Sequence, residues 1–224
     1  TMNLHIGDQR NTDTGTVATG LFDMTGGTLV ARLENLEIGD KERSTGNGSA
    51  GGAFGTFTTG SSAGNDISAI NVVIGRMQRG TGTSVAASMG QGILNMGGGV
   101  FDVFGDVVMG DWSDNSGTNG TARGELNITG GVFTVAGNLV KTDDDRSAAM
   151  ILVDGGTLDG QHQASGDSTM ATIGASQLVW RAGSILDIAS ATLDGRGVTD
   201  GITFGALDTA LILRDNTVAF PVSL

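Results

Sequence analysis

The chain has 224 residues, among them 39 glycines, one proline and no cysteine, and its formal net charge is −12. Charged residues make up only 16% of the chain, which excludes the highly charged composition of disordered proteins. The absence of cysteine excludes disulfides and thiolate metal sites. The negative charge argues against nucleic acid as a partner, because phosphate binding needs a basic patch. No apolar run approaches the roughly 18 residues of a membrane-spanning helix, and because residue 1 is threonine, we expect a fragment or a mature form.

The first predicted elements are short strands in which apolar and polar residues alternate, the pattern of half-buried β-strands. They are expected at residues 4–6, 21–25, 29–31 and 33–38, with a polar loop over residues 9–20 and a turn at Gly26-Gly27. Nothing in this segment has helical period. We therefore expect three short strands in each structural unit.

The same unit continues along the chain, with its strands separated by loops rich in glycine, serine, asparagine and aspartate. Further strands are expected within residues 67–74, 93–110, 126–140, 151–158, 178–180, 185–188 and 210–213. Loops are expected at residues 40–60, 76–92, 111–124 and 142–147. Each period is thus a fixed strand core followed by one loop of variable length.

A repeat becomes visible when the residue that closes the second apolar run is used as an anchor. The anchors are Gly7, Gly39, Gly75, Gly110, Thr142, Gly174 and Gly205. Their spacings of 31 to 36 residues persist from end to end, and the preceding residue is apolar everywhere except at Lys141. A period of this length is typical of solenoids. We therefore predict one all-β domain over residues 1–224, a right-handed parallel β-helix (β-solenoid) of about seven irregular rungs.

Glycine pairs form a second ladder, with one pair after the first strand of a unit. The pairs are Gly26-Gly27, Gly98-Gly99, Gly130-Gly131 and Gly155-Gly156, with Ala182-Gly183 as a degraded copy. Glycine there permits a corner, because it accepts positive φ and has no Cβ that would clash. The segment around Gly60 matches poorly, which indicates a diverged rung.

Stacked rungs are expected to bring equivalent apolar side chains into contact, since one rung alone buries almost nothing. The expected columns are Phe22 with Leu94, Leu126 and Ile151; Met24 with Met96, Ile128 and Val153; Leu29 with Phe101, Phe133 and Leu158; and Leu36 with Val107 and Leu139. Trp180 takes the position of Met24 and Met96. Each rung would gain on the order of 10 kcal/mol from burial before entropy is subtracted.

Three segments carry a resemblance to a known family: Gly26-Gly27-Thr28-Leu29, residues 98–103 (GGVFDV) and residues 130–135 (GGVFTV). They resemble the right-handed parallel β-helix repeats of bacterial surface proteins, as in autotransporter passenger regions and the glycine-rich strand repeats of large secreted proteins. The resemblance covers about residues 4–188. It implies an elongated, extracellular module with a structural or adhesive role, and it specifies architecture better than activity.

Pectin-cleaving enzymes also have parallel β-helices, and two of their acidic motifs have counterparts here. Asn11-Thr12-Asp13 and Asp143-Asp144 resemble them, but they lie 130 residues apart. At about four rungs, or ~19 Å, this separation is too large for an inverting carboxylate pair, which needs roughly 6.5–9.5 Å. His5 and His162 have no suitable partner nearby in sequence. We therefore predict no catalytic function.

Aspartate follows four of the anchors, at Asp8, Asp40, Asp111 and Asp143. In register, Asp111 and Asp143 would lie ~5 Å apart and repel each other by about 1 kcal/mol in water. One interpretation is a calcium site whose metal ligands are Asp111, Asp143, Asp144 and Asp145. The other is that these aspartates cap turns through hydrogen bonds to backbone N–H groups. No cofactor other than Ca²⁺ is expected.

We interpret the chain as a non-catalytic structural or adhesive segment of a bacterial surface stalk, adhesin or fibre, located outside the cell or on its surface. The expected partners are further copies of the chain, bound through the open ends of the solenoid, and carbohydrate or protein of a host or matrix. The alternatives are a polysaccharide-binding or polysaccharide-degrading β-helix protein and a self-assembling extracellular filament subunit. Residues 200–224, which include Pro221, are expected to cap the last rung, because proline cannot donate to a further strand.

Overall fold

The structure is a computed structural model of residues 1–224. It describes residues 2–10, 16–43, 51–79, 88–114, 120–141 and 146–160, together with the backbone of five further strands between residues 171 and 213. Within these residues every element is a β-strand. The described part therefore holds no helix that is long and apolar enough to cross a membrane.

The strands of the N-terminal half are β1 (Asn3–Ile6), β2 (Gln9–Arg10), β3 (Val17–Met24), β4 (Val30–Arg43), β5 (Gly51–Thr59), β6 (Asp66–Arg79), β7 (Ser88–Met96), β8 (Val100–Val103) and β9 (Val107–Asp114). Those of the C-terminal half are β10 (Thr121–Ile128), β11 (Val132–Val135), β12 (Leu139–Lys141), β13 (Ser147–Val153), β14 (Thr157–Gly160), β15 (Ala171–Ile173), β16 (Gln177–Trp180), β17 (Ile185–Ile188), β18 (Ala191–Leu193) and β19 (Ala210–Leu213).

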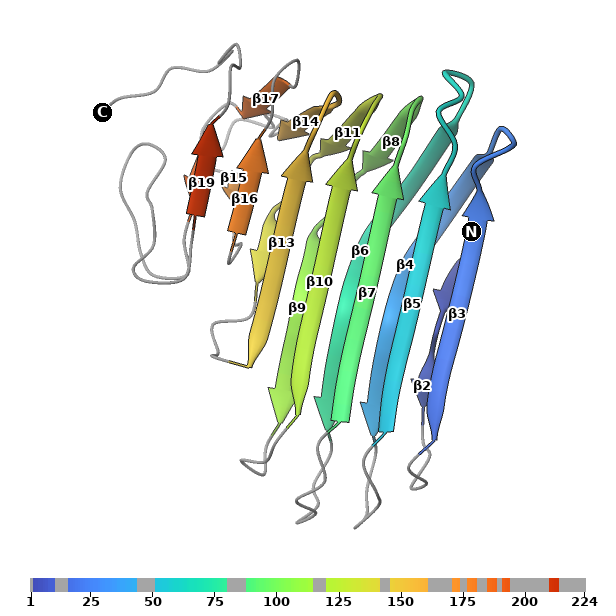
Figure 1. The fold of residues 1–224 in the computed structure, drawn as a ribbon, viewed down its shortest axis with the longest axis vertical. Coiled ribbons are helices and arrows are strands. Elements are labelled where there is room, and N and C mark those ends of the chain that lie inside the picture. The colour runs from blue at the N-terminus through green and yellow to red at the C-terminus, as the bar shows by residue number, and fades with distance from the viewer. Residues whose placement is uncertain are drawn as a thin grey trace.

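The strands form two parallel sheets that face each other, as Figure 1 shows. One sheet has seven strands in the order β19-β16-β13-β10-β7-β5-β3, and the other has twelve, with β4 and β6 near its N-terminal end. In both sheets a strand pairs with the equivalent strand of the next turn and not with its neighbour in sequence. The chain is therefore a parallel β-solenoid, as its period predicts.

Equivalent residues of neighbouring turns stack largely in the predicted register. Phe133 pairs with Phe101, and Leu126 pairs with Leu94 on one side and Ile151 on the other. The rung that the sequence shows as diverged supplies Phe57, which lies between Phe22 and Leu94 and is fully buried. Val72 fills the corresponding place between Leu36 and Val107. Trp180 pairs with Val153, in the column predicted for it.

One predicted column is wrong at its first residue. Ala31, and not Leu29, pairs with Ile67, which in turn pairs with Phe101. The Leu29 carbonyl instead accepts a hydrogen bond from the Asp66 backbone N–H, so Leu29 belongs to the corner. The physical reason is the length of the turn, since the segment between Met24 and Ala31 is two residues longer than the segment between Met96 and Phe101. Counting from the glycine pair therefore shifts the register.

Three of the four predicted glycine pairs have a glycine with positive φ at the corner, whereas Gly26-Gly27 has none, and a Cβ added at Gly26 would meet nothing within 4 Å. Gly99, Gly131 and Gly155 have φ values of 81°, 77° and 95°, a region that favours glycine. The diverged rung has Asn65 at the equivalent place, and this side chain is buried. Its Nδ2 donates to the Gly60 carbonyl at 2.8 Å and to the Gly98 carbonyl at 3.2 Å. An asparagine thus supplies side-chain hydrogen bonds at a corner that other rungs build from glycine.

The anchor glycines have a role that the sequence does not suggest. Gly7, Gly39, Gly75 and Gly110 all have positive φ, but the chain continues as a strand beyond the last three. A Cβ at Gly39 would lie 1.8 Å from the Gln91 carbonyl oxygen of the opposite sheet. The opposite sheet has its own glycine column, formed by Gly20, Gly55, Gly92 and Gly124, whose Cα atoms also approach backbone. We call the contact of these two columns the glycine waist.

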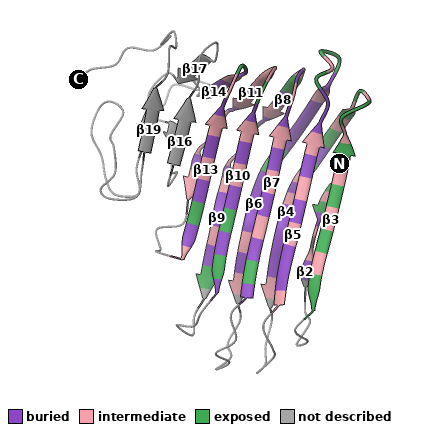
Figure 2. Cartoon of the chain, viewed as in Figure 1, coloured by how far each residue is buried: buried purple, intermediate pink, exposed green. Residues whose placement is uncertain are grey.

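The glycine waist divides the interior into two cores. The larger core contains the stacked columns, among them Leu36, Leu94 and Phe133, which are fully buried. The second core contains Met77, Trp112 and Ala122, beyond the waist. Figure 2 shows that burial continues along β5, β7 and β10 past the middle of the molecule.

The loops predicted after the anchors are therefore too long. Residues 40–43, 76–79 and 111–114 extend β4, β6 and β9, while residues 51–59, 88–92 and 121–124 belong to β5, β7 and β10. The sequence of these segments is typical of loops, because the second core that they form is small and contains polar residues.

The rungs are also less uniform than predicted. The predicted unit of three separate strands recurs for about three turns, from β7 to β15, rather than seven. In the turns before them, β4 and β6 each run around the corner as one long strand. Ile173 pairs with Leu139 instead of Lys141, which shifts the anchor series there. The anchors Thr142, Gly174 and Gly205, the pair Ala182-Gly183 and the expected cap at residues 200–209 and 214–224 lie outside the described residues.

Candidate functional site

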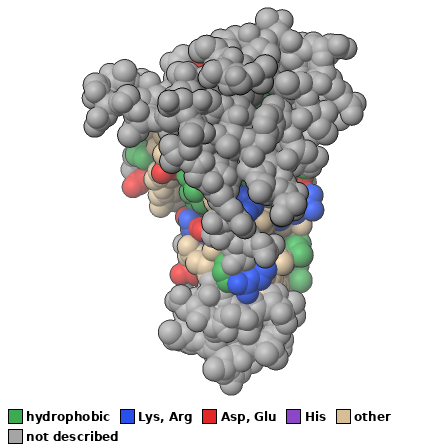
Figure 3. Space-filling model, turned by 90° about the vertical axis from the view of Figure 1, so that its left-hand side faces the viewer, with side chains coloured by type: hydrophobic (Ala, Val, Ile, Leu, Met, Phe, Trp, Pro, Cys, Tyr) green, Lys and Arg blue, Asp and Glu red, His purple; other side chains and the backbone are tan. Residues whose placement is uncertain are grey.

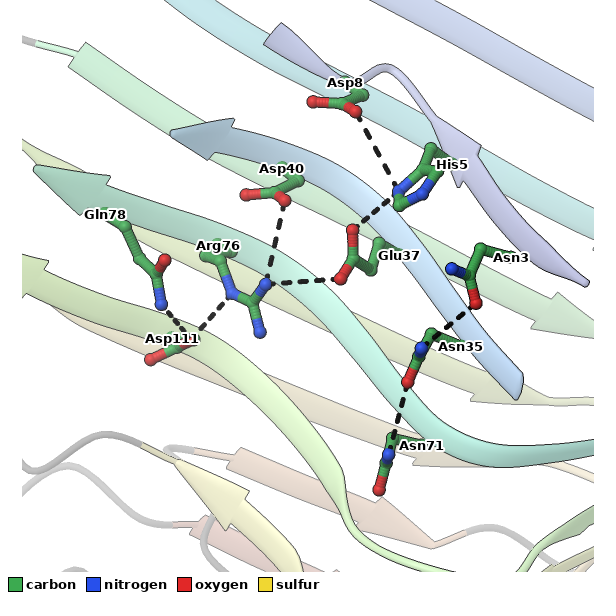
Figure 4. A network of polar contacts seen from close by, with 10 residues as sticks. All are labelled: Asn3, His5, Asp8, Asn35, Glu37, Asp40, Asn71, Arg76, Gln78 and Asp111. Atoms are coloured by element: carbon green, nitrogen blue, oxygen red, sulfur yellow. Dashed lines mark hydrogen bonds and ion pairs between the residues drawn. The ribbon is translucent and has the colours of Figure 1, made fainter. Parts of the chain in front are cut away.

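A network of polar side chains runs along the solenoid axis, next to the glycine waist. His5 on β1 pairs in register with Glu37 on β4, and Asp40 on β4 pairs with Arg76 on β6. Arg76 pairs with Asp111 on β9. Figure 4 shows these side chains reaching from one rung to the next. We call this set the polar ladder.

Arg76 is the cation at the centre of the polar ladder. Its Nε donates to Asp111 Oδ2 at 2.9 Å and its Nη1 to Glu37 Oε1 at 3.4 Å, and Nη1 lies 3.7 Å from Asp40 Oδ2. The aspartate column of the sequence is thus interrupted by an arginine between Asp40 and Asp111. Because Asp40 is only 1% exposed, the charge of Arg76 offsets a repulsion that water cannot screen well.

His5 has a partner that sequence reasoning missed. Its Nδ1 lies 2.6 Å from Glu37 Oε2 and 3.9 Å from Asp8 Oδ2. Glu37 follows His5 by one repeat, so the period itself is the signal that could have found this pair.

Asparagine side chains continue the rung-to-rung bonding on both sheets. Asn71 Nδ2 donates to Asn35 Oδ1 at 3.2 Å, and Asn35 Nδ2 donates to Asn3 Oδ1 at 3.1 Å. On the seven-stranded sheet, Asn127 Nδ2 donates to Asn95 Oδ1 at 2.9 Å. These ladders stabilise the stacking of rungs, because the amides of Asn35 and Asn95 each accept from one neighbouring rung and donate to the other.

A second group of buried residues lies in segments that the sequence pattern predicts to be loops. Gln9, Lys41, Met77 and Trp112 occupy consecutive register positions in the second core. Lys41 is 2% exposed, which is rare for lysine. The Arg146 guanidinium carbon lies 3.7 Å from the centre of the Trp112 ring, so one face of this indole is covered.

The exposed charges next to the corner form a further contact between rungs. The Arg32 guanidinium donates to the Asp66 carboxylate and, through Nη1, to the Asp66 carbonyl oxygen at 2.7 Å. The hydrogen bond to the Asp66 side chain raises the pKa of Arg32 above its ordinary value. Arg32 nevertheless keeps 57% of its side chain exposed.

Of the four predicted calcium ligands, only Asp111 lies within the described residues. Asp111 accepts from Arg76 and, at 3.4 Å, from Gln78 Nε2. Asp143, Asp144 and Asp145 lie outside the described residues, as do Asn11-Thr12-Asp13 and His162. In the part of the chain that the structure describes, no group of three or more His, Asp or Glu side chains has the arrangement of a metal site. Calcium binding therefore stays a prediction, and titration of chelator-treated protein with Ca²⁺ tests it.

The parallel pairing of strands from turn to turn places the chain in one class of proteins, the parallel β-solenoids. No protein-family model, no curated protein and no solved structure matches the chain. The resemblance to bacterial surface proteins thus remains a prediction from the sequence.

Proposed function

We propose that this chain is a non-catalytic structural segment of an extracellular stalk, adhesin or fibre of a bacterial surface. The observation that supports the proposal is that side chains of neighbouring rungs contact one another along the solenoid axis. Inside, Phe57, Leu94 and Leu126 form an apolar column without exposed surface. Around it, the polar ladder and the asparagine ladders join neighbouring rungs from β1 to β10. Such bonding supports a load-bearing or spacing role.

The polar ladder has the character of a cross-link. Arg76 is shared by three carboxylates, those of Glu37 and Asp40 on β4 and of Asp111 on β9, and it is 20% exposed. An arginine that is held by several carboxylates fixes their positions and is poorly suited to proton transfer, because it stays charged. We therefore assign the ladder a stabilising role.

The polysaccharide alternative finds less support in the described residues. Sugar-binding surfaces commonly stack aromatic rings on the ligand, and the chain has two tryptophans and no tyrosine. Trp112 is 8% exposed and lies under Arg146. One face of its ring is therefore covered by Arg146, and the side chain offers little surface on which a sugar could stack.

The catalytic alternative is tested with a panel of neutral and acidic polysaccharides. We expect no new reducing ends from the purified chain, and the same result from the variant Glu37→Gln. Release of reducing ends that disappears in Glu37→Gln would contradict the proposal, because His5 and Glu37 would then act as a catalytic pair.

The extracellular location is tested on intact cells of the source organism. An antibody against the chain is expected to label unpermeabilised cells or the culture medium. Labelling that appears only after permeabilisation would contradict the location.

A further inference from the structure

We propose that the corner between β8 and β9 binds a basic segment of another protein, and that a large apolar side chain of this segment packs beside Phe104. The proposal rests on the structural function proposed above and adds a partner to it. It follows from the exposed apolar residues at the corner, from the acidic residues around them and from the contacts of the chain's own cations. The residues of the corner lie between β4 and β12, on inner rungs of the described chain.

Three large apolar side chains are exposed at or near this corner. Ile70, Val100 and Phe104 are 43%, 39% and 62% exposed. Among the aromatic side chains that the structure describes, Phe104 is the only exposed one. An exposed ring leaves apolar surface in water, which burial against a partner would remove. Where such side chains are neighbours, they mark a candidate binding surface.

Ile70 and Phe104 are neighbours on successive rungs. The Gly105 backbone N–H donates to the Ile70 carbonyl oxygen at 2.7 Å, which places Phe104 beside Ile70. Ala136 takes the same position in the next rung, because its N–H donates to the Val103 carbonyl oxygen at 2.8 Å. Alanine is too small to cover a phenylalanine ring, so Phe104 stays exposed on that side. The apolar surface therefore extends over two rungs and ends at Ala136.

Acidic residues flank this apolar surface. Glu34 takes the position of Ile70 in the preceding rung and is exposed. Asp102 and Asp106 stand two residues before and two residues after Phe104. The three carboxylates give the corner a negative charge, which attracts a cation.

A second copy of this chain is a poor partner for the corner. The chain has a net charge of −12, so a second copy would bring a like charge toward the three carboxylates. Lys and Arg side chains do reach the surface in places, as Figure 3 shows for the side on which β16 and β19 lie. However, acidic residues or an aromatic ring of the same chain already hold Arg32, Arg76, Arg123 and Arg146. We therefore assign the cations that fit the corner to another protein.

A polypeptide segment supplies both an apolar side chain and a cation within a few residues. Nucleic acid carries the same sign of charge as the corner and would be repelled. Apolar contact with an aromatic residue often provides much of the affinity of a protein interface, whereas charges at its rim act mainly on the association rate and its salt dependence. We therefore expect Phe104 to control the affinity and Asp102 to control the dependence on salt.

Fluorescence anisotropy of a labelled synthetic peptide tests the site on the full chain. The probe is a short peptide of alternating lysine and leucine, and we expect saturable binding. Phe104→Ser and Ile70→Ser should each weaken binding by about tenfold or more, because they remove the apolar contact. Asp102→Asn should reduce the loss of affinity between low and high salt. All three variants should keep the circular dichroism of the wild type, since none of these side chains is buried.

Matched variants and peptides separate the site from general attraction to an acidic chain. Met89→Ser on β7 removes a side chain that is 39% exposed, and Asp23→Asn on β3 removes an exposed carboxylate, both on the other sheet. Neither should change the affinity by more than about twofold. A peptide of lysine and serine should bind about tenfold more weakly than the probe, and a peptide of glutamate and leucine should not bind.

Carbodiimide cross-linking locates the bound peptide. The reagent joins a peptide lysine to a carboxylate in contact with it, and mass spectrometry of the digest is expected to find links at Glu34, Asp102 or Asp106. The site would be overturned by links only elsewhere, by equal binding of the peptide of lysine and serine, by unchanged binding in Phe104→Ser, or by no binding of the probe at millimolar concentration. Each of these results leaves the non-catalytic structural function standing, whereas polysaccharide cleavage would overturn that function.

Discussion

Phe101 and Phe133 lie in neighbouring rungs with their ring centroids 5.0 Å apart, although they belong to separate repeats of the sequence. Phe57, on β5 of the opposite sheet, contacts Phe101 across the interior with centroids 6.3 Å apart, and Phe22 stacks on Phe57 at 5.0 Å. The rings thus form one cluster that joins several turns and both sheets, and Phe57, Phe101 and Phe133 have no exposed surface. Burial of these rings stabilises the stacking of one rung on the next.

Truncation of a fully buried phenylalanine should therefore lower the stability of the chain. Phe133→Ala is expected to lower the free energy of unfolding by about 3–5 kcal/mol, because it removes a fully buried ring and leaves a cavity. Phe104→Ala is the control, since Phe104 is 62% exposed, and its effect should stay within about 0.5 kcal/mol. Denaturant unfolding measures both, and equal effects would contradict the stacked column.

The glycine waist should not tolerate a methyl group. Gly39→Ala is expected to destabilise the chain by more than about 2 kcal/mol, because φ is 69° and the new Cβ would overlap the Gln91 carbonyl oxygen. Gly26→Ala is the matched control, since nothing lies within 4 Å of its added Cβ. Thermal unfolding followed by circular dichroism compares the two variants. A small effect at Gly39 would show that the sheets are not in backbone contact.

Arg76 should be needed to hold the acidic residues of the polar ladder together. Arg76→Met is expected to cost about 2–4 kcal/mol, because it leaves the buried carboxylate of Asp40 next to Glu37 and Asp111 without this cation. Arg123→Met, which removes an exposed ion pair, should cost less than about 1 kcal/mol. Denaturant midpoints at one pH measure the difference, and a neutral Arg76→Met would contradict the cross-linking role.

Asp23 should titrate below its ordinary range. The Thr25 backbone N–H donates to Asp23 Oδ1 at 2.9 Å and lowers the pKa of this carboxyl below 3.8. A lowered pKa in the folded state contributes stability above the unfolded pKa, and this contribution is lost as pH falls through the folded pKa. Carboxyl NMR titration should place the Asp23 pKa lower in the wild type than in Thr25→Pro, which lacks the donor. The same pKa in both would show that the hydrogen bond is absent.

The repeat and the parallel solenoid could be predicted because their signal is local and recurrent. Each turn repeats an apolar alternation, a glycine corner and an anchor, so the period alone places Phe101 beside Phe133. The column assignment failed at Leu29 because the turn after Met24 has a different length, which a fixed count from the glycine pair cannot detect.

The second core could not be predicted in the same way. Its members include Gln9 and Lys41, whose side chains are typical of solvent-exposed loops, and the strands that carry them pass through glycines that normally end a strand. The polar ladder was within reach of the sequence, because His5 and Glu37 are one repeat apart. It was missed because catalytic partners were sought nearby in sequence and not in register.

The central claim is that residues one repeat apart are neighbours in space, and disulfide trapping tests it most directly. Asn95 and Asn127 are register partners on β7 and β10, so Asn95→Cys with Asn127→Cys should form an intramolecular disulfide under mild oxidation. Asn95→Cys with Glu125→Cys is the out-of-register control, with its Cα atoms ~8 Å apart, beyond the reach of a disulfide. The stacked solenoid predicts rapid closure of the first pair and none of the second. Equal closure of both pairs, or failure of the first, would contradict it.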